Sequence, residues 1–161
     1  MKAGAVLLFC AFGTAPVAAG SPAIDPVYRP YLARAEACLS GPVPEAVCVG
    51  IVETACLADR GEVADIARAK TDCALGAAQV WTHLADRIGA EIAARLTADG
   101  PAQTILVRYR EDWRGWMRET CDLEQRMEGG PLMRQLASAQ CRSRQARDHA
   151  LGLSNLRGAL P

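Results

Sequence analysis

The stretch CALGAAQVWTHLADRIGAEI, Cys73–Ile92, decides the fold of this chain. Its large apolar residues recur at intervals of three and four, which is the spacing of an amphipathic helix: Val80, Trp81, Leu84, Ile88 and Ile92. The same periodicity extends on both sides, from Glu62 to about Ala98. We therefore expect one long central helix, the longest of the chain.

Glycine and proline divide the rest of the chain into further helices. Such residues end one helix and start the next at four places: Gly41-Pro42, Gly61, Gly100-Pro101 and Gly129-Gly130-Pro131. No run of residues alternates between apolar and polar as a strand would. We expect an all-α fold, a disulfide-stapled bundle of about five helices, with residues 28–157 as a single domain.

The N-terminal residues have the pattern of an export signal. Lys2 precedes an apolar run, and Val17-Ala18-Ala19 forms a small-residue cleavage pattern, so residues 1–19 are predicted to be a signal peptide. The apolar run is shorter than the roughly 20 residues that span a bilayer, so no stable membrane anchor is expected after cleavage. Residues 20–27 are rich in Gly, Ser and Pro, and we expect a flexible leader there. The predicted location is periplasmic or secreted.

Six cysteines remain after residue 19, which in a short exported chain indicates a disulfide framework. Six cysteines allow about 15 pairings, and the count alone does not choose among them. Neighbouring cysteines flank successive turns of the helix map, where antiparallel helices bring side chains close together. On that basis the predicted bridges are Cys38–Cys48, Cys56–Cys73 and Cys121–Cys141.

All three tryptophans are predicted to lie in the core. Trp81 belongs to the central helix. On the helix from about Ala102, a common side holds the residues Leu106, Tyr109, Trp113, Trp116, Met117 and Thr120, with Cys121 just beside it. Charged residues line the opposite side, so Trp113 and Trp116 are expected to point inward.

The spacing of cysteine and tryptophan resembles the LprI-like lysozyme-inhibitor domain, a family of small exported helical proteins. The resemblance is carried by Cys73-x7-Trp81, Trp113-x2-Trp116-x4-Cys121, the Gly-Gly break and Cys141-x11-Leu153, and it covers roughly Cys38 to Leu153. The chain departs from the family's pattern at Met117-Arg118-Glu119, Ala77, Ala146 and His149. The resemblance implies a helical domain that binds and inhibits a lysozyme-type hydrolase.

Charge and motifs argue against several other classes of protein. The chain has 18 basic and 18 acidic residues, with the acidic excess before residue 100 and the basic excess after it. The chain has no dense cluster of Lys and Arg of the kind that binds nucleic acid. No His-Glu-x-x-His, phosphate loop or Gly-x-Ser-x-Gly motif is present, and His83 and His149 are expected at the surface or its boundary. We therefore expect no enzyme activity, no metal and no cofactor.

Two turns are candidates for docking to a protein partner, because a disulfide would hold each of them rigid. One is LSGPVPE, between Cys38 and Cys48; the other is DLEQRMEGGP, between Cys121 and Cys141. An arginine in such a turn could pair with the carboxylates of a hydrolase cleft. The candidate binding residues are Arg114, Arg118, Arg126, Gly129 and Gly130. The alternative is an envelope interaction or structural module without inhibitory activity.

Overall fold

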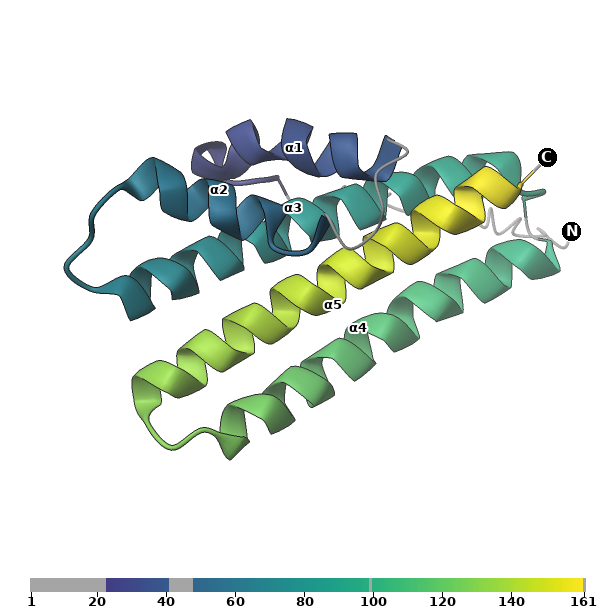
Figure 1. Cartoon of the computed structure of the whole chain (residues 1–161). Coiled ribbons are helices and arrows are strands. Elements are labelled where there is room, and N and C mark those ends of the chain that lie inside the picture. The colour runs from purple at the N-terminus through teal and green to yellow at the C-terminus, as the bar shows by residue number, and fades with distance from the viewer. Residues whose placement is uncertain (1–22, 41–47, 99, 161) are drawn as a thin grey trace, which may run out of the picture.

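The structure, a computed structural model, describes residues 23–40, 48–98 and 100–160. All regular structure in these residues is helical, which confirms the predicted all-α class (Figure 1). The elements in chain order are the 3-10 helix η1 (Pro26–Tyr28) and the helices α1 (Arg29–Ser40), α2 (Ile51–Arg60), α3 (Ile66–Arg95), α4 (Pro101–Met127) and α5 (Pro131–Ala159). The predicted signal peptide, residues 1–19, lies outside the described residues.

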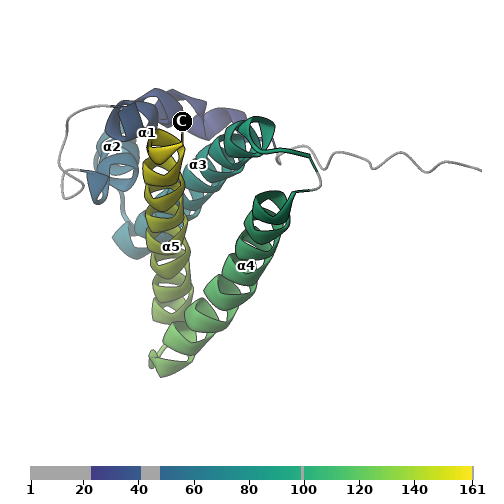
Figure 2. The ribbon, with the colours of Figure 1, turned by 90° about the vertical axis from the view of Figure 1, so that its right-hand side faces the viewer.

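The long helix α3 is the centre of the bundle, as predicted, and α5 packs along it (Figures 1 and 2). The apolar stripe of α3 is buried, and Trp81 is only 1% exposed. Small side chains at Ala77, Ala146 and Ala150, all fully buried, let the two helices approach closely. Each large apolar side chain buried here stabilises the fold by about 1.5–3 kcal/mol.

Helices α1 and α2 pack on α3, and α4 packs mainly along α5, on the far side from α1 and α2 (Figures 1 and 2). Tyr31 and Ala35 of α1 and Val52 of α2 are buried against the core. Residues of α1, α2, α3 and α5, joined by Leu106 of α4, share one hydrophobic cluster, and we call these four helices the body of the protein.

Three disulfides connect successive helices, and all three predicted pairings are confirmed. The Cα–Cα distances are 5.7 Å for Cys38–Cys48, 5.6 Å for Cys56–Cys73 and 5.4 Å for Cys121–Cys141. These values fall within the range of about 4.4–6.8 Å that a disulfide needs. Two bridges tie α1, α2 and α3 together in series, and the third ties α4 to α5.

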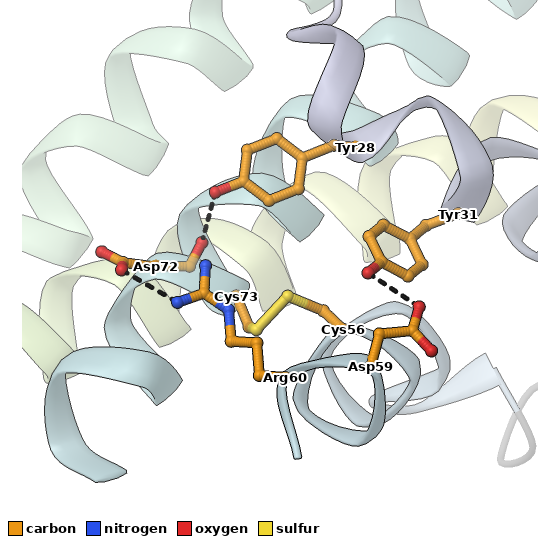
Figure 3. The surroundings of a disulfide bond; sticks show 7 residues. All are labelled: Tyr28, Tyr31, Cys56, Asp59, Arg60, Asp72 and Cys73. Carbon is orange, nitrogen blue, oxygen red and sulfur yellow. Dashed lines mark hydrogen bonds and ion pairs between the residues drawn. A yellow bond between two sulfur atoms is a disulfide. The ribbon is translucent and has the colours of Figure 1, made fainter. Parts of the chain in front are cut away.

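Polar contacts surround the Cys56–Cys73 bridge and fix η1 and α1 on the body (Figure 3). The hydroxyl of Tyr28 donates to the main-chain oxygen of Asp72 at 3.1 Å, and Tyr31 donates to Asp59 Oδ2 at 3.0 Å. Burial raises the pKa of both phenols. The ring of Tyr28 lies over Gly76, where any side chain would overlap it.

In residues 23–27, the described part of the predicted leader, Ile24 is buried and the other four residues are exposed. The carboxylate of Asp25 accepts a hydrogen bond from the Val27 N–H at 3.0 Å and so caps η1.

A glycine in the left-handed conformation marks the start of the second helix. Helix α2 begins at Ile51, directly after Gly50, whose φ is +71°. That left-handed conformation favours glycine and turns the chain into the helix. Cys48 consequently lies in the turn before α2 and not inside it.

The prediction that Trp116 belongs to the core is wrong, because this side chain is 53% exposed. Trp113 is half-buried and packs at the edge of the core. The bridge to Cys141 turns Cys121 toward α5, and at 3.6 residues per turn Trp116 then points about 140° away from Cys121. The disulfide therefore sets the rotation of α4 and places Trp116 outside.

Candidate protein-binding site

Helix α4, all of which is described, carries a row of exposed large apolar residues on the side away from Cys121, and one of them, Tyr109, also contacts His149 of α5. We call this row the outer stripe. Its members and their exposed fractions are Ile105 (65%), Tyr109 (45%), Trp116 (53%), Leu123 (61%) and Met127 (78%). Contiguous exposed apolar surface of this kind marks interaction sites in soluble proteins.

The outer stripe is narrow and straight because its members follow helical spacing. All five side chains project about 120–160° around the helix from Cys121, the residue that faces α5. The stripe extends from Ile105 to Met127, which corresponds to about 33 Å along the helix axis. The five side chains therefore lie in one row along the edge helix, with an interval of seven residues on each side of Trp116.

The turn between α4 and α5 extends this apolar surface. We call residues 126–133 the hairpin tip, which lies at the opposite end of α5 from the C-terminus (Figure 1). Leu132 and Met133 are 41% and 47% exposed, close in sequence to Met127. The bridge from Cys121 to Cys141 closes this hairpin, as the sequence predicted, and limits its freedom in solution.

The glycines of the hairpin tip are not required by its geometry. Neither Gly129 nor Gly130 has a positive φ, and a side-chain carbon at either position would contact nothing within 4 Å. Substitutions there leave the turn intact in principle, so they can test binding without disturbing the fold. The predicted break between the helices is confirmed, with Pro131 as the first residue of α5.

The candidate arginines do not form one patch. Arg114 joins Arg110 in binding a single carboxylate oxygen of Asp86 on α3, at 2.8 and 2.7 Å. Arg118 and Arg126 are exposed, and neither pairs with a carboxylate among the described residues. Arg114 therefore holds α4 to α3, whereas Arg126 lies at the hairpin tip, where a partner could reach it.

His149 of α5 lies beneath α4 and is buried, contrary to the expectation of a surface or boundary position. Its ring stacks on Trp113, with centroids 3.9 Å apart and planes 7° apart. Burial and the nearby Arg110 lower the pKa of His149 from 6.5 to about 4, against the opposing effect of Asp86. The apolar spacing around position 149 does not predict this stack, because the two rings belong to different helices.

The second candidate turn, between Cys38 and Cys48, falls mostly in residues 41–47, outside the described part. Within residues 23–40, 48–98 and 100–160, no group of three His, Cys, Asp or Glu side chains could hold a metal ion. In the same ranges, no helix combines the length and apolar character needed to cross a bilayer. The candidate docking surface that lies within the described residues is therefore the outer stripe together with the hairpin tip.

Sequence reasoning assigned Trp116 and Tyr109 to the core and overlooked Ile105, Leu123 and Met127. The signal for them is present in the sequence, since these five residues are spaced four, seven, seven and four apart. Such spacing forms a second apolar side on a helix that already has one side for packing.

Comparison with protein-family models, with curated proteins and with solved structures finds no match to this chain. The resemblance to the LprI-like domain thus stays a prediction based on the spacing of its cysteines and tryptophans.

Proposed function

We propose that this chain is an exported, non-catalytic binding protein that docks to another protein through the outer stripe and the hairpin tip. The observation that carries the proposal is the exposure of Trp116 and its four apolar neighbours on a helix at the edge of the bundle. Tryptophan is enriched among the residues that dominate binding energy at protein interfaces. The three disulfides support folding in an oxidising compartment, either the periplasm or the extracellular medium.

The proposed partner is a lysozyme-type peptidoglycan hydrolase, blocked by occlusion of its cleft. Such a cleft contains two carboxyl groups, and a guanidinium can bind carboxylates through two parallel hydrogen bonds. Arg126 at the hairpin tip supplies the cation, and Met127 beside it supplies apolar contact area. The Cys121–Cys141 bridge supports this role, because a closed hairpin loses little conformational entropy on binding.

A second candidate is an envelope interaction module with no inhibitory activity. The length of the outer stripe, about 33 Å, favours this candidate, because a partner helix could lie along all of it. In that case Trp116, near the middle of the stripe, contributes most of the affinity and Arg126 contributes little.

The experiment uses oxidised protein lacking residues 1–19, tested against several lysozyme types for inhibition and for binding. Inhibition that is lost on Arg126→Ala and weakened by Trp116→Ala supports the hydrolase proposal. The matched control is Arg34→Ala on α1, an exposed arginine distant from the hairpin tip, which should leave inhibition unchanged. An absence of inhibition together with Trp116-dependent capture of an envelope protein supports the second candidate. Binding that ignores both Trp116 and Arg126 contradicts the assigned surface.

A further inference from the structure

The N-terminal half of α4 is attached to the body by one buried apolar residue, Leu106, and otherwise mainly through charged and aromatic groups. Trp113 stacks on the buried His149, and the same helix places Arg110 and Arg114 on Asp86. Tyr109 also packs near the imidazole, at a centroid distance of 5.3 Å. Of the 27 residues of α4, all described, only Leu106 and Cys121 are themselves buried.

His149 is poorly placed to carry a positive charge. Its side chain is 5% exposed, and its Nδ1 atom is buried without a hydrogen-bond partner among the described residues. The charged groups that face it are Arg110 and Arg114 from α4 and Asp86 from α3. Asp86 already accepts hydrogen bonds from both guanidinium groups, so a third cation in this space is not compensated.

We propose that the Trp113–His149 contact is an acid-sensitive latch: protonation of His149 releases the N-terminal part of α4 from the body, while the Cys121–Cys141 bridge retains the helix. Release exposes Leu106, the inner side of Trp113 and the surface of α3 and α5 beneath them. The latch is a property of this fold and does not depend on which partner the outer stripe binds.

The direction of the pH dependence follows from the pKa of His149, which is lowered to about 4 in the docked state from an ordinary value of 6.5. Above pH 6.5 the histidine is neutral whether α4 is docked or released, so docking has its full strength. As the pH falls below 6.5, the released state takes up the proton first and gains population. The gain reaches about 150-fold at pH 4 and approaches its limit of about 300-fold only well below pH 4, as this pKa difference requires.

Hydrogen exchange of the oxidised protein at pH 7.5 and pH 4 measures the release directly. The protection factors of residues 101–120 should fall by at least tenfold and up to about 150-fold, whereas those of α3 should fall much less. The chain has two histidines, His83 and His149, so His83→Gln is a matched control and should behave as wild type. His149→Phe keeps an aromatic ring against Trp113 without a titrating group, and should abolish the fall.

Carboxylates also titrate in this pH range, and the same variants separate their effect from the latch. If the protection factors of α4 fall equally in His149→Phe and in the wild type, the change is due to carboxylates and the proposal is overturned. The proposal is also overturned if the protection factors of α4 fall by less than tenfold, or if those of α3 fall as much as those of α4. Should His149→Phe fail to fold, the single histidine of His83→Gln can be followed by NMR. Its titration must lie below 6.5 and coincide with the loss of protection in α4; a midpoint at 6.5 or above contradicts the latch.

Discussion

The body and α4 are joined to the same protein by different physical means. In α3, 14 of 30 residues are buried, and they pack against α1, α2 and α5. In α4 the corresponding number is 2 of 27, and the helix is held by a disulfide, three ion pairs, two aromatic contacts with His149 and the buried Leu106. Apolar burial thus defines the body, whereas a covalent bond and charged groups define the position of α4.

This difference explains why an apolar stripe faces the core in α3 but the solvent in α4. The amphipathic stripe on α3 faces the core, and Cys73, which forms the bridge to Cys56, lies on the same buried side of that helix. On α4 the bridge at Cys121 fixes the rotation, and Arg110 and Arg114 lie within about 20° of the same direction. The apolar stripe therefore remains outside, where it can bind a partner.

The largest expected effect on stability comes from removing a tryptophan from the body. Trp81→Ala empties a fully buried site in α3 and should lower the free energy of unfolding by about 3–5 kcal/mol. Urea denaturation of the oxidised protein measures the loss. A loss below about 1 kcal/mol would show that α3 is not the centre of the core.

Removal of the third bridge tests whether a covalent bond positions α4. The bridge spans 20 residues, so Cys121→Ser with Cys141→Ser should reduce stability by about 3 kcal/mol. Hydrogen exchange should accelerate mainly in α4. The control removes Cys38 and Cys48 instead, which should loosen α1 and spare α4. Equal loosening of α4 in both double variants would contradict the distinct attachment of this helix.

Substitutions that break ion pairs should have a smaller effect on stability. They compare the part-buried cluster around Asp86 with a pair at the surface. Asp86→Asn leaves two guanidinium groups without their carboxylate at a site where Asp86 is 9% exposed, and should cost about 2 kcal/mol. Asp72→Asn removes the exposed pair with Arg60 and should cost less than about 1 kcal/mol. Thermal unfolding of both variants makes the comparison, and similar losses would indicate that Asp86 has no special role in docking α4.

The smallest effect on stability is expected at the outer stripe. Trp116→Ala should change the free energy of unfolding by no more than about 0.5 kcal/mol, because the side chain is half exposed and contributes little to the core. Its effect on partner affinity should be at least tenfold. A stability loss comparable to that of Trp81→Ala would place Trp116 in the core after all.

The fold could be predicted largely because its determinants are local. Helix boundaries follow from glycine and proline, and Gly100-Pro101 and Gly130-Pro131 begin α4 and α5 at the expected places. The disulfide pairing follows from the order of the helices, since each bridge crosses one turnaround. The burial of Ile24, by contrast, does not follow from the Gly, Ser and Pro content of residues 20–27.

The binding surface could be predicted only in part. The hairpin tip and Arg126 follow from the turn and its flanking cysteines. The roles of Trp116, Arg114 and His149 depend on the rotation of α4 about its axis, which a helical wheel does not fix. A wheel centred on Cys121, with that residue directed toward α5, would have placed Trp116 outside and Arg114 inside.

The order of the cysteines has a consequence for how the protein matures. Each bridge joins two cysteines with no other cysteine between them, at separations of 10, 17 and 20 residues. A polypeptide that emerges N-terminus first presents each thiol directly before its native mate, so oxidation in order of emergence yields the correct set. Production of the active protein should therefore require a thiol oxidant and no disulfide isomerase.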